Sequence, residues 1–129
     1  MFWNTLKMED PLFEKVINEV LKELPPDLKA ALATVQILVQ EEPGPDQLKR
    51  SGLKPGSELF GLFDGLSLKD WPLGSDRQFP DRVILFKGSL RRYYPKKEDL
   101  TREIRKTLIY ELGHFFGFSE QELKDRGLS

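Results

Sequence analysis

The segment that decides the fold is residues 109–120, which read IYELGHFFGFSE. It contains His114, the only histidine in the 129-residue chain, and it ends a stretch whose apolar residues recur at helical spacing. Gly117 stands where a glycine commonly ends a helix, and Ser119 with Glu122 has the spacing of a capping box that opens another helix. The segment therefore predicts a long amphipathic helix, a glycine stop and a short final helix.

The polar flank of the long helix, expected at residues 98–116, carries the side chains of chemical interest. At about 100° per residue, four polar side chains fall on one flank beside a broad apolar face: Glu103, Thr107, Tyr110 and His114. Glu111 lies at the border between this flank and the core. A polar stripe beside a buried face is suited to presenting ligands to a cleft.

The rest of the chain predicts a small sheet with helices packed on one face. Helices are expected at residues 11–24, 27–32, 98–116 and 119–126, and strands at residues 34–39, 58–63 and 82–86. The third strand is the most apolar and is predicted to be central, while Gly61 in the second predicts a bulge or a close backbone approach. Irregular connections are expected at residues 41–57 and 68–81, and a basic loop at residues 87–97. The order indicates an α+β fold with a mixed sheet of three to four strands, in a single domain spanning residues 1–129.

Composition excludes several classes of function. Hydrophobic residues make up 39% and charged residues 32% of the chain, which is typical of a soluble globular protein. The net charge of −1 provides no global field for nucleic acid or anionic lipid, and no apolar run reaches the length of a membrane span. The absence of cysteine excludes thiolate zinc ligands, thiol nucleophiles and disulfides. Because the N-terminus has no apolar signal sequence, a cytoplasmic location is expected.

The motif segment resembles the zinc-binding helix of zincin hydrolases, whose pattern is H-E-x-x-H. In that pattern two histidines one helical turn apart bind zinc, and the glutamate activates the bound water. Residues 110–120 are similar to the longer pattern H-E-x-x-H-x-x-G-x-x-D of the minimal zincins, a family of small bacterial proteins, with Glu111, His114 and Gly117 in matching positions. The order of the expected helices and strands over residues 10–127 is also similar. The resemblance implies a compact zincin core, a zinc site and metallopeptidase activity.

Two positions depart from the family pattern: Tyr110 replaces the first histidine, and Glu120 replaces the aspartate. The second change is mild because both residues are carboxylates. The first is severe, because a phenol with a pKa near 10 must lose its proton to bind zinc strongly, at a cost of about 4 kcal/mol at pH 7. By the resemblance, Tyr110, His114 and Glu120 are the candidate metal ligands and Glu111 is the candidate general base. Each also has an ordinary structural interpretation, for example Glu120 as an acidic residue in the first turn of a helix.

Three functions remain open. In the first, a zincin-like protein with a degenerate motif binds zinc weakly or not at all, has little or no peptidase activity, and acts as a binding module for a peptide or protein in its cleft. In the second, the chain is an active zinc peptidase that uses the atypical Tyr110, His114 and Glu120 site with Glu111 as base. In the third, the basic and aromatic residues from Arg91 to Lys97 bind nucleic acid. We favour the first because the fold pattern is intact and one metal ligand is lost. No membrane partner is expected.

Overall fold

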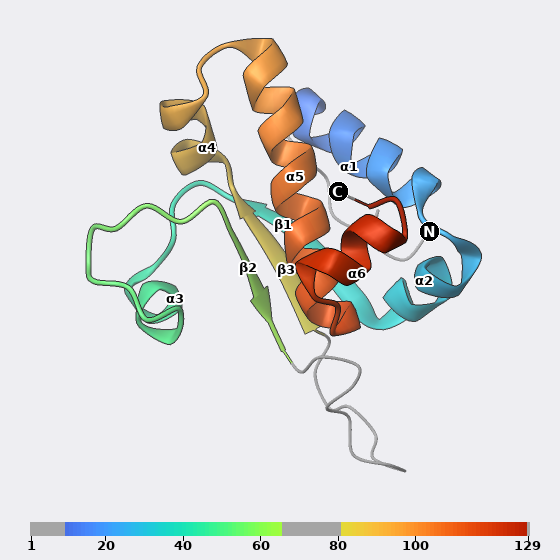
Figure 1. The fold of residues 1–129 in the computed structure, drawn as a ribbon. Coiled ribbons are helices and arrows are strands. Elements are labelled where there is room, and N and C mark those ends of the chain that lie inside the picture. The colour runs from blue at the N-terminus through green and yellow to red at the C-terminus, as the bar shows by residue number, and fades with distance from the viewer. Residues whose placement is uncertain (1–9, 66–80, 129) are drawn as a thin grey trace.

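The computed structural model describes residues 10–65 and 81–128, so the connection expected at residues 68–81 lies almost entirely outside the described part of the chain. Its helices are α1 (Pro11–Glu23), α2 (Pro26–Ala31), α3 (Pro45–Arg50), α4 (Lys87–Tyr93), α5 (Lys97–Phe116) and α6 (Glu120–Asp125), with a 3₁₀ turn at Leu32–Thr34 (Figure 1). Its strands are β1 (Val35–Gln40), β2 (Gly61–Asp64) and β3 (Asp81–Phe86). The α+β fold is confirmed. Within the described ranges, no helix combines the length and the apolar character needed to cross a bilayer.

β3 is the central strand of the sheet, as its apolar sequence predicts. The strand order is β1-β3-β2, with β1 parallel to β3 and β2 antiparallel to it. Four consecutive residues of β3, from Val83 to Phe86, are buried, which is typical of a strand that is covered on both faces. β2 is an edge strand of four residues, shorter than the expected 58–63 and displaced toward Asp64.

The main core lies between the sheet and two helices, α1 and α5, which run beside each other across the sheet (Figure 1). α1 begins at Asp10, whose carboxylate accepts a hydrogen bond from the Phe13 N–H at 3.5 Å. One stripe of α1 is buried: Phe13, Val16, Ile17, Val20 and Leu21. α5 contributes Leu100, Ile104, Leu108, Leu112 and Phe115 to the same core. Burying a side chain of this size contributes about 1.5–3 kcal/mol, so the core holds α5 firmly against β2 and β3.

The segment predicted to be a basic loop, residues 87–97, is mostly helical, and that prediction was wrong. α4 occupies Lys87–Tyr93, and its Ser89 and Leu90 are fully buried. The N–H of Gly88 donates to the carbonyl of Glu41 at 2.9 Å, which ties the start of α4 to the end of β1. Seven residues with a single large apolar anchor show no helical period, so only their burial against the sheet reveals the helix.

The connection predicted at residues 41–57 also contains a helix, α3. Pro45 occupies its first turn, and the side chain of Gln47 accepts a hydrogen bond from the Gly44 N–H at 2.7 Å. Leu48 is buried on its inner side. Glycine and proline are common in loops, but proline in the first turn of a helix leaves no donor unpaired and is a favourable start.

Candidate functional site

The C-terminal end of α5 turns the chain so that α6 returns beside it. Gly117 adopts a left-handed conformation with φ of 78°, and the N–H of Phe118 donates to the carbonyl of Gly113 at 2.9 Å. α6 then begins with the capping box of Ser119 and Glu122. Both features confirm the sequence prediction, and together they place the first turn of α6 against the last turns of α5.

Gly113 lets the two helices approach closely. A Cβ atom at Gly113 would lie 2.9 Å from Cδ1 of Leu123, so a larger residue would require the Leu123 side chain to move. Leu123 is buried in this contact. Gly113 therefore provides the space that the Leu123 side chain occupies between α5 and α6.

Glu111 is buried and joins α5 to the edge strand β2. Its Oε1 accepts a hydrogen bond from the N–H of Phe63 at 2.9 Å and lies 3.1 Å from Nδ1 of His114. Because an ionised carboxylate can only accept, Nδ1 carries the proton in that state. Burial raises the pKa of Glu111, while His114 and the Phe63 N–H each lower it. The candidate base is thus already held by two donors.

Tyr110 and His114 lie one turn apart on the exposed flank of α5. Their rings meet edge to face, with centroids 4.5 Å apart and planes at 68°. Tyr110 is 45% exposed, and the side chain of His114 is 46% exposed. The structure thus brings Tyr110, His114 and Glu111 together on the flank that the helical wheel predicts.

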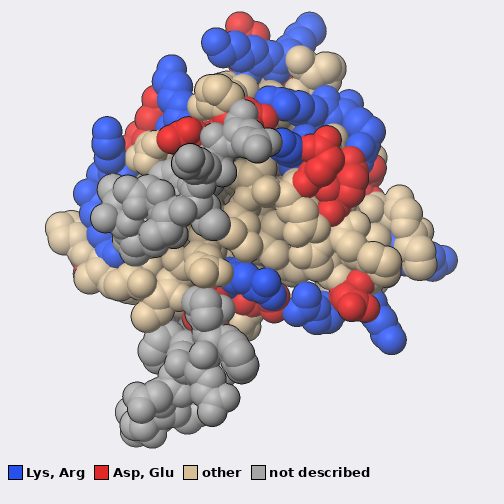
Figure 2. All heavy atoms as spheres, turned by 180° about the vertical axis from the view of Figure 1, so that it is seen from behind, with Lys and Arg blue, Asp and Glu red and all other residues tan. Residues whose placement is uncertain are grey.

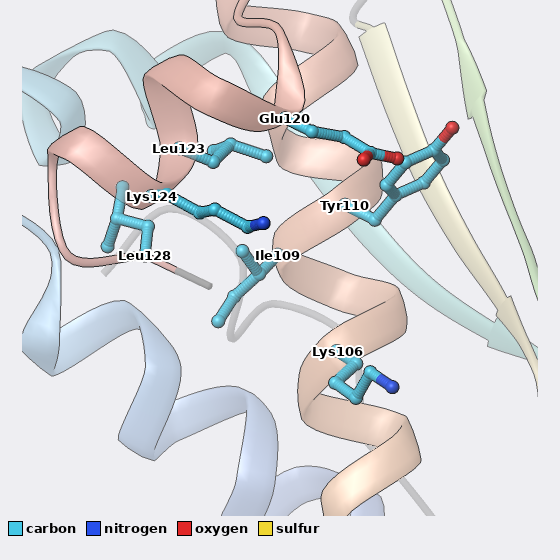
Figure 3. A pocket seen from close by; sticks show the side chains of 7 residues that line it. All are labelled: Lys106, Ile109, Tyr110, Glu120, Leu123, Lys124 and Leu128. Atoms are coloured by element: carbon cyan, nitrogen blue, oxygen red, sulfur yellow. The ribbon is translucent and has the colours of Figure 1, made fainter.

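Glu120 is exposed at the start of α6 and lines a pocket together with Tyr110. Figure 3 shows its side chain extending from α6 toward the part of α5 that carries Tyr110. His114 does not line this pocket. All four predicted site residues therefore belong to one region, but the structure gives them no common centre.

The donors present do not fit a zinc site. Among the described residues, no three His, Asp or Glu side chains gather closely enough to hold a metal ion. The motif offers one imidazole, one exposed carboxylate and a phenol, and a phenol must lose its proton to bind a metal ion strongly. Structural and catalytic zinc sites use at least three good protein ligands.

A cleft of about 340 Å³ lies between β2 and α5, on the side of Tyr110 that faces the sheet. Gly61 lines it from the start of β2, together with Leu59 and Phe60, which directly precede the strand. α5 contributes Glu103, Lys106, Thr107, Tyr110 and Glu111. A Cβ atom at Gly61 would lie 2.7 Å from Cγ2 of Thr107 and 3.2 Å from the carbonyl of Ile84. The close approach that the sequence predicted at Gly61 is confirmed.

An aromatic cluster that the sequence did not reveal lies near the cleft. The ring of Phe60 packs against Tyr93 and Tyr94, with centroids 5.3 Å and 5.7 Å apart. The pKa of Tyr94 is raised, first by desolvation and then by the nearby Glu103, which also lines the cleft. Only the pair of adjacent tyrosines hinted at this cluster, because its third ring comes from a segment more than thirty residues earlier.

The arginines of residues 87–97 are engaged in ion pairs within the protein. Arg91 pairs with Asp10 at 2.7 Å, and Arg92 pairs with Glu42 at 2.7 Å and with Glu58 at 2.8 Å. On the face shown in Figure 2, basic and acidic side chains alternate and form no broad patch of one sign. This arrangement does not favour the nucleic-acid hypothesis, which needs basic groups that are free to contact phosphates.

The comparison with known proteins bears on the family. No curated protein matches the sequence. The family described as zincin-like metallopeptidase matches residues 32–128, a range that contains all three strands, α5, α6 and every candidate site residue. The match covers about three quarters of the chain. The chain therefore belongs to the zincin-like metallopeptidase family.

Proposed function

We propose that this zincin-like protein has a degenerate metal motif, binds little or no zinc, has little or no peptidase activity, and binds an extended peptide in the cleft between β2 and α5. The observation that supports the proposal is the set of contacts that Tyr110 and Glu111 make within the motif. Tyr110 stands in place of the first histidine and packs its ring on His114, while Glu111 is held by the backbone of Phe63. A site that has lost a nitrogen ligand and whose base supports a strand is better suited to binding than to hydrolysis.

The cleft has the dimensions and the border that a peptide needs. Its volume of about 340 Å³ lies at the lower end of the range of about 300–1,000 Å³ for ligand pockets. β2 is an edge strand, and the Phe63 N–H points to α5 instead of β3. Gly61 lies two residues earlier, so its backbone groups face the same side and border the cleft. A peptide strand added there would gain main-chain hydrogen bonds.

Metal analysis of the purified protein tests the first half of the proposal. We expect substoichiometric zinc in the wild type and a higher, tightly held zinc content in Tyr110→His, because that change restores the missing nitrogen ligand. Tyr93→His is the matched control, since Tyr93 is also an exposed tyrosine but lies outside the motif. One tightly bound zinc per wild-type chain would contradict the proposal.

Blocking the cleft tests the second half of the proposal, that a peptide binds between β2 and α5. Peptides selected for binding to the wild type from a random library should lose affinity at least tenfold for Thr107→Trp, which places a large ring in the cleft. Thr101→Trp is the control on the same helix, because Thr101 does not line the cleft. Circular dichroism checks that both variants fold. Equal affinity for the two variants would place the peptide elsewhere.

A second candidate is an active peptidase that uses Tyr110, His114 and Glu120. It is favoured by the contact of Tyr110 with His114 and by the pocket that Tyr110 shares with Glu120. Metal-dependent cleavage of a fluorogenic peptide pool, abolished by Glu111→Gln, would support this candidate. Absence of cleavage in the wild type with added zinc would exclude it.

A further inference from the structure

A second, smaller pocket lies on the opposite side of Tyr110, between α5 and α6 (Figure 3). Its base is formed by three aliphatic side chains, which are each 6–7% exposed: Ile109, Leu123 and Leu128. Tyr110 and Lys106 line both this pocket and the cleft between β2 and α5. These two residues therefore form a ridge with a binding space on either side.

The size and lining of the pocket limit what it can hold. Its volume is about 190 Å³, below the range of about 300–1,000 Å³ that is typical of sites for drug-sized ligands and cofactors. The aliphatic base offers no hydrogen-bonding side chain. One large apolar side chain fits this space, and its burial would provide the binding free energy.

The rim of the pocket carries two lysines and one carboxylate. Lys106 and Lys124 come from α5 and α6, and Glu120 lies beside Tyr110 (Figure 3). Lys106 is only 3.4 Å from Glu103, but within the described residues Lys124 makes no ion pair. Lys124 is therefore the cation of the rim that can attract a negative group next to the apolar base.

We propose that this pocket binds the C-terminal residue of a peptide, with its apolar side chain against Ile109 and Leu123 and its α-carboxylate toward Lys124. An apolar side chain and a carboxylate occur on the same residue only at a peptide C-terminus. The inference deepens the proposed function, because a peptide in the cleft that crosses the ridge of Tyr110 would end in this pocket. It makes the cleft selective for short or C-terminal segments with a large apolar last residue.

Small probes test the pocket without needing the cleft. N-acetyl-leucine and N-acetyl-phenylalanine, added to the ¹⁵N-labelled full chain, should shift the backbone amide resonances of Ile109, Leu123 and Lys124. The amide of N-acetyl-leucine should bind roughly two- to fivefold more weakly, because it lacks the negative charge that the exposed Lys124 attracts. N-acetyl-alanine should bind about tenfold more weakly than N-acetyl-leucine, because it buries less apolar surface. Equal shifts with all probes, or shifts confined to Phe60 and Thr107, would overturn the proposal.

A pair of lysine variants tests the charge. Lys124→Glu should remove the preference for the carboxylate over the amide, whereas Lys49→Glu should leave it unchanged. The two lysines are matched, since both are exposed and both lie in the last turn of a six-residue helix, but Lys49 belongs to α3 and does not line the pocket. A carboxylate preference that survives Lys124→Glu would count against the proposed orientation.

The two proposals can fail separately. Thr107→Trp blocks the cleft but does not alter the pocket, so N-acetyl-leucine should still shift Leu123 and Lys124 in that variant. Loss of library peptides with retention of N-acetyl-leucine supports both sites. Binding of library peptides with no response to N-acetyl-leucine supports the cleft and overturns the pocket.

Discussion

Two segments of the chain are rich in polar residues, but their side chains have different surroundings in the folded protein. In residues 87–97, the cationic groups of Arg91 and Arg92 pair with acids from distant parts of the chain, at Asp10, Glu42 and Glu58. In residues 109–120, the acid Glu111 is buried, while the phenol of Tyr110 and the imidazole of His114 remain about half exposed, and Tyr110 lines a cleft. The first segment stabilises the fold, whereas the second leaves two polar rings accessible to solvent.

The difference teaches that the density of charge in a sequence does not measure the charge available for binding. An arginine is available only when no carboxylate of the same chain lies within reach, and Arg92 lies fifty residues from Glu42 in sequence. In the motif segment, by contrast, the side chains of Tyr110 and His114 remain accessible, because α5 places them on the flank that faces away from the core. Four experiments sharpen this comparison.

The largest effect is expected where the motif helix meets the edge strand. Gly61→Ala adds a Cβ atom 2.7 Å from Cγ2 of Thr107, so β2 or α5 must shift, at a cost of about 1–3 kcal/mol in the free energy of unfolding. Urea unfolding measures the loss. In the background of Thr107→Ala, which removes the nearest atom, Gly61→Ala should cost less. Equal costs in both backgrounds would show that the strain lies instead at Cγ of Glu111, 3.1 Å away, or at the Ile84 carbonyl, 3.2 Å away.

Replacing Glu111 tests whether its carboxylate supports β2. Glu111→Leu leaves the Phe63 N–H without its acceptor and should lower the free energy of unfolding by about 1–3 kcal/mol. Glu111→Gln keeps an acceptor oxygen at nearly the same place and should cost less. Hydrogen exchange of the Phe63 amide should accelerate in the leucine variant alone. Unchanged protection in that variant would mean that another group accepts the bond.

A smaller effect concerns the pH dependence of stability. Burial raises the pKa of Glu111 above its ordinary value of 4.5, so the unfolded chain loses this proton at a lower pH than the folded protein does. Stability therefore falls as pH rises through 4.5 and the folded pKa, and it is restored at lower pH. Glu111→Gln cannot ionise, so it should gain stability relative to the wild type over that range. A difference between the two that does not change with pH would contradict this explanation.

The smallest effect is expected in the basic segment. Arg92→Met removes ion pairs with Glu42 and Glu58 whose side chains are partly exposed, so the melting temperature should fall slightly, and by less at about 1 M salt. Lys29→Met is the control, because Lys29 is exposed and makes no ion pair within the described residues. If the segment instead bound nucleic acid, a labelled oligothymidine would bind the wild type in a salt-dependent way and Arg92→Met more weakly.

Regular patterns in the sequence predicted the parts of the fold that depend on local rules. The period of Leu100, Ile104 and Leu108 predicted α5, the apolar run at residues 82–86 predicted a central strand, and Gly117 with Ser119 predicted the turn into α6. α3 and α4 were missed, because each has only six or seven residues and is stabilised by contacts with distant segments. Periodicity needs several turns before it becomes visible.

In the candidate site, too, some features follow from local sequence rules and others follow from contacts between distant segments. Helical spacing by itself placed Tyr110, Glu111 and His114 on one flank of α5, because neighbours one turn apart share a face in any helix. Only the tertiary structure decided that Glu111 bonds to the backbone of Phe63, since that contact spans forty-eight residues. The tertiary structure also decided that Gly61 lines a cleft and that Leu123 lines a pocket, because both spaces depend on how separate elements pack. Local geometry follows from the covalent chain, whereas the partners of a side chain follow from which surfaces the core brings together.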